Sequence, residues 1–210
     1  MNSKYFDMLL KVIPTKYLAI NEEVQLKIVY TAMHGVGFPF VERAFEIAKL
    51  RPVDAVVEQR DPDPEFPTVK FPNPEEGKSC LVLSMKLADD VGSDLIAAND
   101  PDADRLAIAE RDLNTKQWKV FNGNEIGSLL GWWSLQYYKD KCPGADLSNC
   151  YMLASTVSSK MLKTMSRVEG FNFEETLTGF KWMGNRSVEL MKEGKEVLFA
   201  FEEAIGFMFS

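Results

Sequence analysis

The sequence has few cysteines, no long apolar run and no excess of positive charge. Its three cysteines, Cys80, Cys142 and Cys150, form no C-x-x-C pair. Three cannot all pair in disulfides, so we expect reduced thiols in a cytoplasmic protein. No stretch reaches the roughly 18 to 20 consecutive apolar residues of a membrane-spanning helix. Residues 1–30 mix charged and apolar side chains and do not resemble a signal peptide.

The charge balance narrows the possible partners. The chain has 24 Lys and Arg residues against 31 Asp and Glu residues, a formal net charge of -7. This excess of negative charge argues against a nucleic acid or an acidic membrane as partner. It does not exclude a phosphorylated substrate, because an anion site is local and needs only a few donors and a metal ion. The 210 residues, 46% of them hydrophobic, suffice for one large soluble domain or two modest ones.

Hydrophobic periodicity and turn residues predict alternating strands and helices. Strands are predicted at residues 24–30, 95–98, 106–109, 118–121, 151–154 and 197–201. Helices are predicted at residues 40–50, 81–88, 125–138, 160–168 and 187–193. A proline-rich, acidic segment at residues 60–76 should form an extended loop. There is no clear internal repeat.

The alternation of strands and helices predicts an α/β fold of two successive layered domains with mixed sheets. We place the first domain at residues 1–117 and the second at residues 118–210. The second is expected to be truncated, because the sequence stops soon after the predicted strand at residues 197–201. Such a truncation would expose apolar side chains and lower solubility. The side chains expected to be exposed are Phe199, Phe201, Phe207 and Phe209.

Three aspartates, Asp100, Asp102 and Asp104, follow the apolar residues 95–98 directly. Their alternation places three carboxylates on one side of the chain, where they repel one another unless a cation neutralises them. Carboxylate oxygens suit Mg²⁺ or a similar divalent ion. The end of a strand is also where open α/β sheets place their ligands. The segment therefore predicts a divalent-metal site.

Other acidic loops fit this segment less well. An EF-hand requires glycine at its sixth position and glutamate at its twelfth, where this sequence has Arg105 and Arg111. An aspartyl-phosphatase loop would need a threonine that is absent here. An acidic turn that caps a helix or faces water stays an alternative, although the neighbouring Arg105 and the apolar strand weaken it.

The segment D-P-D-A-D-R at residues 100–105 resembles the metal loop of the α-D-phosphohexomutase superfamily, usually written D-G-D-x-D-R. Pro101 stands in the glycine position, which is typical of the phosphoglucomutase-2/phosphopentomutase branch. By this resemblance Arg105 would lie beside the phosphate of a phosphoserine, where a guanidinium can make two hydrogen bonds. The resemblance also implies three ligands of Mg²⁺: Asp100, Asp102 and Asp104.

Two later segments match the same family in order. T-G-F-K at residues 178–181 resembles its T-G-[FW]-K loop, and E-E-A-I-G at residues 202–206 resembles its sugar-binding loop, commonly G-E-E-S-x-G. The resemblance implies that Glu202 binds sugar hydroxyls, Thr178 contacts the substrate and Lys181 faces a phosphate. By themselves, the first segment could be an ordinary loop and the two acids of the second could be helix N-terminal acids.

Ala204 occupies a position where many family members have serine. The change removes or replaces one hydrogen bond to the sugar and is consistent with a branch that accepts pentose phosphates. Together with Thr178 and residues 183–185, it favours the mutases over their glucose-1,6-bisphosphate synthase relatives.

The only histidine, His34, and a serine-rich turn could suggest further catalytic groups. His34 lies in H-G-V-G at residues 34–37, and histidine titrates near neutral pH, so a general base is possible. The family has an H-G-x-G turn at this place, and we favour a structural role for it. For the turn at residues 155–159 we favour an N-cap of the next helix over a nucleophile or phosphate cradle.

The resemblance implies a Mg²⁺-dependent phosphosugar mutase, an intramolecular phosphotransferase of the isomerase class that moves phosphate between C1 and C5 or C6 through a bisphosphate. Its expected substrates are ribose or deoxyribose 1-phosphate and glucose 1-phosphate, in carbohydrate metabolism. The full-length enzyme is expected to be a monomer without nucleic-acid or membrane partners. The family's phosphoserine lies in a T-x-S-H-N-P-like loop, and no such motif occurs in this sequence. We therefore expect no catalytic residue here and negligible activity of this chain by itself.

Two other functions stay open. A non-catalytic module or regulatory short isoform would bind Mg²⁺ and a sugar phosphate without turnover. A metal-dependent phosphatase would hydrolyse sugar phosphates instead.

Overall fold

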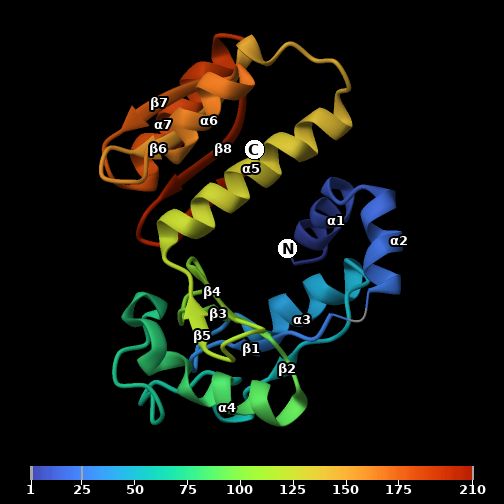
Figure 1. Cartoon of the computed structure of the whole chain (residues 1–210), viewed down its shortest axis with the longest axis vertical. Helices are drawn as coiled ribbons and strands as arrows, with labels where there is room; N and C mark the ends of the chain where they lie inside the picture. Colours follow the sequence, from blue (N-terminus) through green and yellow to red (C-terminus); the bar gives the residue numbers. More distant parts are fainter. Residues whose placement is uncertain (1, 25, 210) are drawn as a thin grey trace. The chain divides into compact units, whose positions relative to one another are not determined.

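A computed structural model describes residues 2–24 and 26–209, and the chain divides into two compact units, Met1–Val120 and Phe121–Ser210 (Figure 1). Both units are α/β, and both sheets are mixed, which confirms the predicted fold class. Within the described residues, no helix is both long and apolar enough to cross a membrane. Cys80 and Cys150 are buried, Cys142 is half-buried, and the three form no disulfide.

The first unit contains one five-stranded sheet, in the order β2-β1-β3-β4-β5. Its strands are β1 (Val29–Thr31), β2 (Asp54–Ala55), β3 (Leu95–Asn99), β4 (Leu106–Arg111) and β5 (Trp118–Val120). Its α-helices are α1 (Asn2–Val12), α2 (Thr15–Glu23), α3 (Phe38–Ile47) and α4 (Val82–Val91). Short 3-10 helices occupy Val57–Gln59 and Pro74–Leu81.

The parallel part of this sheet is formed by β2, β1 and β3, whereas β4 and β5 run antiparallel to their neighbours. All three residues of β1 are buried, as expected of a central strand covered on both faces. Helix α4 packs on β1 and β3, and α3 lies on the other side of the sheet (Figure 1). Because β1 and β3 are parallel, the segments that follow their carboxyl ends emerge side by side.

The beginning of the first unit differs from the prediction. In place of a strand over residues 24–30, α2 extends to Glu23 and only Val29–Thr31 pairs with neighbouring strands. Gln25, part of the predicted strand, lies outside the described residues. Helices α1 and α2 were not predicted, and α1 packs against α3.

The predicted domain boundary, between residues 117 and 118, lies just before β5. Strand β5 pairs with β4, with Arg111 opposite Trp118. The structure therefore keeps Trp118–Val120 in the first unit and divides the chain after Val120.

The second unit contains a four-stranded sheet in the order β7-β6-β8-β9. Its strands are β6 (Cys150–Ser155), β7 (Asn172–Thr176), β8 (Glu196–Glu202) and β9 (Gly206–Phe209). Its helices are α5 (Gly123–Lys141), the 3-10 helix Leu147–Asn149, α6 (Met161–Glu169) and α7 (Phe180–Lys192). Strands β7, β6 and β8 are parallel, and β9 returns antiparallel to β8.

The second sheet has a packed core on each face. One core joins α5 and α6 to the sheet through Leu135, Leu162 and Phe199. The other joins α7 to the sheet through Met183, Leu190 and other side chains. Because both faces are covered, the middle of β8 is continuously apolar rather than alternating.

The expected exposure of Phe199 and Phe201 is wrong, because both side chains are 0% exposed. Small residues let α5 lie close over them: a Cβ added to Gly127 would lie 2.3 Å from a ring carbon of Phe201. Strand β9, which was not predicted, covers the edge of β8. Phe207 is partly buried and Phe209 is 54% exposed.

Candidate functional site

The three aspartates lie in the hairpin loop between β3 and β4. Asn99 and Leu106 are paired across the two antiparallel strands, so residues 100–105 form the connection between them. The amide of Ala103 donates to the carbonyl of Asp100 at 3.0 Å. Ala103 has a φ of 61°, a left-handed conformation that is uncommon for a residue with a Cβ. The surroundings must therefore hold this loop in shape.

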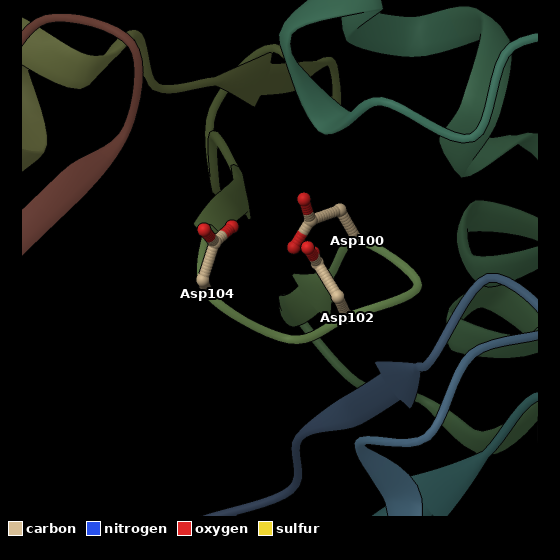
Figure 2. A group of neighbouring side chains, drawn as sticks. All are labelled: Asp100, Asp102 and Asp104. Carbon is tan, nitrogen blue, oxygen red and sulfur yellow. The ribbon is translucent and has the colours of Figure 1, made fainter.

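The carboxylates of Asp100, Asp102 and Asp104 gather on one side of this loop (Figure 2). One carboxylate oxygen from each residue lies within 4.8 Å of those of the other two. Asp100 is buried, with 6% exposure, whereas Asp102 and Asp104 are exposed. The predicted ligands are thus brought together, with one anchored in the protein and two accessible.

Burial raises the pKa of Asp100 to about 6, although a hydrogen bond from the Arg105 amide opposes this effect. The negative charges of Asp102 and Asp104 raise the pKa further. Such crowding of carboxylates is unfavourable without a positive charge nearby. The donor set consists of hard oxygen ligands, which fit Mg²⁺ or another hard divalent cation.

Arg105 closes the loop and is joined to Asp100. Its backbone amide donates to Oδ1 of Asp100 at 3.1 Å, and its Nε lies 3.7 Å from Oδ2. The Arg105 side chain remains 37% exposed. A guanidinium in this position can contact an anion bound beside the carboxylates.

A turn after β1 packs directly against the aspartate loop. The amide of Val36 donates to the carbonyl of Pro101 at 2.9 Å. A Cβ added to Gly35 would lie 2.2 Å from Cα of Pro101, so only glycine allows this approach. The H-G-V-G turn at residues 34–37 therefore supports the predicted metal loop.

His34 belongs to this supporting turn. It is 3% exposed, and its Nε2 lies 2.8 Å from Oγ1 of Thr68. Gln59 links Thr68 to Thr31: its amide nitrogen donates to Thr68, and its amide oxygen accepts from the Thr31 hydroxyl at 2.7 Å. Both Met33 and His34 adopt positive φ angles, 49° and 61°. His34, Gln59 and Thr31 are buried in this network, and Thr68 is exposed. The network supports the structural interpretation of His34.

In the second unit, Glu202 and the T-G-F-K segment are in contact. Oε2 of Glu202 accepts a hydrogen bond from the amide of Gly179 at 3.0 Å. A Cβ added to Gly206 would lie 2.3 Å from the ring of Phe180, so the loop after β8 packs closely on the start of α7. Two segments that are distant in the sequence thus form one surface at the ends of β7 and β8.

The two other predicted substrate-binding residues lie beside this surface. Thr178 is exposed in the connection from β7 to α7. Lys181 is exposed in the first turn of α7, with Nζ 6.0 Å from the ring centre of Trp182. Helix α7 begins at Phe180, earlier than the predicted start at Ser187, so Lys181 is held by a helix rather than a loop.

Glu203, which the sequence motifs did not single out, anchors the loop after β8. Its Oε2 accepts hydrogen bonds from Ser155 at 2.8 Å and Ser158 at 3.0 Å. Burial opposes ionisation, yet these hydrogen bonds hold the pKa of Glu203 below its ordinary value of 4.5. The sequence signal for this contact was a polar residue at the end of each apolar strand: Ser155 ends β6, and Glu203 follows β8.

The predicted N-cap within residues 155–159 is confirmed in part, because the hydroxyl of Ser159 accepts a hydrogen bond from the first residue of α6. Lys160 occupies the N-cap position of α6, and its side chain makes no capping hydrogen bond. Ser159 accepts from the amide of Met161 at 3.2 Å. Ser155 and Ser158 are themselves buried and turn inward to the partly buried Glu203, because buried hydroxyl groups need a hydrogen-bond acceptor.

Comparison with known proteins identifies the class that this fold and these sites define. Residues 3–114 match the family described as phosphoglucomutase/phosphomannomutase, alpha/beta/alpha domain II, and residues 122–210 match its domain III. The chain belongs to the phosphoglucomutase/phosphomannomutase family. The resemblance drawn from the sequence motifs is thereby confirmed. Enzymes of this family are generally metal-dependent.

Among individual relatives, the chain is 55% identical to human phosphopentomutase over 209 residues, which cover 99% of this chain and 34% of that protein. It is 53% identical to mouse glucose 1,6-bisphosphate synthase over 205 residues, covering 98% and 32%. It is 49% identical to the phosphoribomutase of Saccharomyces cerevisiae over 187 residues, covering 86% and 30%. The chain thus spans about a third of the length of these relatives.

Solved structures show the same fold at lower identity. A putative phosphomannomutase from Thermus thermophilus matches with a TM-score of 0.71 and 20% identity, over 98% of this chain and 41% of that chain. An N-acetylphosphoglucosamine mutase from Aspergillus fumigatus, in complex with GlcNAc-6P and magnesium, matches with a TM-score of 0.66 and 15% identity, over 98% and 40%.

Proposed function

We propose that this chain is the metal-binding and sugar-binding part of a Mg²⁺-dependent phosphosugar mutase. The observation that carries the proposal is the convergence of three carboxylates in the β3–β4 loop, with Arg105 beside them. The magnesium in the related Aspergillus mutase supports this choice of ion. When bound, Mg²⁺ would neutralise negative charge on a phosphoryl group during its transfer.

The chain's own residues have separate roles in this proposal. Asp100, Asp102 and Asp104 hold the ion, and the accessible guanidinium of Arg105 binds a phosphate beside it. In the second unit, Glu202 accepts hydrogen bonds from sugar hydroxyls, and the amide of Gly179 orients its carboxylate. Thr178 contacts the substrate, and the charge of Lys181 attracts a phosphate.

The whole enzyme would be a phosphopentomutase or phosphoglucomutase in the cytoplasm, active as a monomer. It would move phosphate between C1 and C5 or C6 of ribose, deoxyribose or glucose phosphates through a bisphosphate. The names of the human and yeast relatives support a pentose phosphate as substrate. The identities to the phosphopentomutase and to the synthase are nearly equal, so our preference for a mutase rests on Ala204 together with Thr178 and residues 183–185.

We further propose that the 210 residues bind substrate without converting it. Phosphoryl transfer needs a carrier, and the sequence contains no T-x-S-H-N-P-like loop. A non-catalytic module that binds Mg²⁺ and sugar phosphate is the second candidate function, favoured by this same observation.

Calorimetry with Mg²⁺ followed by glucose 1-phosphate or ribose 1-phosphate tests the binding function. A coupled assay for the formation of glucose 6-phosphate or ribose 5-phosphate tests turnover. We expect binding of the ion and of the sugar phosphate without conversion. Conversion by the purified chain would overturn the proposed lack of turnover. Hydrolysis to inorganic phosphate would instead indicate a phosphatase.

A further inference from the structure

Two side chains behind the aspartate loop form a chain of hydrogen bonds that the proposed function does not use. Tyr30, on β1, is 2% exposed and donates its hydroxyl to Oδ1 of Asn99 at 2.9 Å. Asn99, the last residue of β3, donates from Nδ2 to the backbone carbonyl of Arg105. The side chain of Asn99 thus connects the residue before the loop to the residue that closes it.

The chemistry of these groups determines the direction of the hydrogen bonds. The carbonyl of Arg105 can only accept, so the amide nitrogen of Asn99 must face it. The amide oxygen then faces Tyr30, which must donate. Burial and the nearby Asp100 raise the pKa of Tyr30 above its ordinary value of 10.0, so the hydroxyl keeps the proton that it donates.

The loop needs such support for two reasons. Ala103 is held at a positive φ, and the three neighbouring carboxylates repel one another. Removing the Tyr30 hydroxyl would leave the amide oxygen of Asn99 without this donor and allow the amide to turn. The hydrogen bond that holds the closing end of the loop would then weaken.

We propose that Tyr30 is a positioning residue for the metal site: by orienting the amide of Asn99, it holds residues 100–105 in the arrangement that brings the three carboxylates together. The inference rests on the proposed metal-binding function. Tyr30 acts through Asn99, so its effect must disappear when Asn99 is removed.

The first test measures the affinity for Mn²⁺ alone, by electron paramagnetic resonance of the free ion. Tyr30→Phe removes only the hydroxyl and should weaken binding by about threefold to tenfold, the value of one hydrogen bond. Tyr5→Phe makes the same chemical change at an exposed position of the same unit, 48% exposed, and should change nothing. In an Asn99→Ala background, Tyr30→Phe should cause no further loss.

The second test measures hydrogen exchange of the metal-free chain. The amides of Ala103 and Arg105 donate within the loop, and Tyr30→Phe should accelerate their exchange while Tyr5→Phe does not. Unchanged exchange and unchanged Mn²⁺ affinity would overturn the inference, as would an equal loss of affinity in the Asn99→Ala background. If the natural chain binds no Mn²⁺ but Tyr30→Phe still accelerates exchange, the metal-binding function fails and the positioning of the loop by Tyr30 stands.

Discussion

The carboxylate of Glu203 is hydrogen-bonded to the hydroxyl of Ser155, which joins the end of β8 to the end of β6. Ser158 donates to the same oxygen, and the two hydroxyl oxygens lie 2.7 Å apart. Both serines are buried, with 0% and 3% exposure. Glu203 therefore anchors the loop in which its neighbour Glu202 is proposed to bind sugar.

We predict that Glu203→Gln destabilises the second unit. The change removes the charge of a partly buried carboxylate that accepts hydrogen bonds from two buried serines, at a cost of about 1–3 kcal/mol. Urea unfolding followed by circular dichroism measures this loss. In a Ser155→Ala/Ser158→Ala background the loss should be much smaller, and an equal loss there would contradict the role of the serines.

The stability that Glu203→Gln loses should depend on pH. The pKa of Glu203 is lowered by folding, so ionised Glu203 contributes stability above its unfolded value of 4.5. This contribution is lost as the pH falls through the lower folded value. The difference in unfolding free energy between the natural chain and Glu203→Gln should therefore be complete near neutral pH and shrink below about pH 4.5. A difference that is constant with pH would argue against an ionised Glu203.

For Glu202→Gln we predict a loss of substrate affinity with little change in stability. Substrate affinity should fall by about tenfold or more, because charge-assisted hydrogen bonds to sugar hydroxyls become neutral ones. Stability should change by less than about 0.5 kcal/mol, since the remaining amide oxygen can still accept from Gly179. Calorimetry with glucose 1-phosphate in the presence of Mg²⁺ measures the first effect. Unchanged affinity would remove Glu202 from the proposed sugar site.

A methyl group at Gly35 should disturb the aspartate loop. In Gly35→Ala the new Cβ would lie 2.2 Å from Cα of Pro101, so the backbone must move. We expect a loss of about 1–3 kcal/mol in unfolding free energy and weaker Mn²⁺ binding. Gly184→Ala is the control: a Cβ there meets nothing within 4 Å on α7, and the change should stabilise by about 0.5–1 kcal/mol. Equal effects of the two changes would contradict the close approach.

Asp102→Asn should reduce Mn²⁺ affinity by at least about tenfold, because it removes one of three charged ligands. In the metal-free chain it should not destabilise, since it also removes a negative charge that acts on Asp100. Asp90→Asn, at an exposed position on α4 in the same unit, should alter neither property. Retention of full affinity in Asp102→Asn would argue against the proposed site.

The local parts of the molecule could be predicted from the sequence. The three aspartates lie within five consecutive residues between two apolar strands, so their clustering needs no distant contact. Strand β8 is buried on both faces and is therefore recognisable as a continuous apolar run. Strand β9 and helices α1 and α2 could not be assigned in the same way, because pairing and packing with distant residues decide their structure.

Short sequence motifs predicted the family, which the comparisons confirm, and a set of site residues that stays a prediction. The contacts that hold these residues in place could be seen only in the folded chain. Tyr30 meets Asn99 across 69 positions of sequence and Ser155 meets Glu203 across 48. Parallel strands bring these residues together at their carboxyl ends, and such contacts depend on strand order and register, which no short segment of sequence specifies.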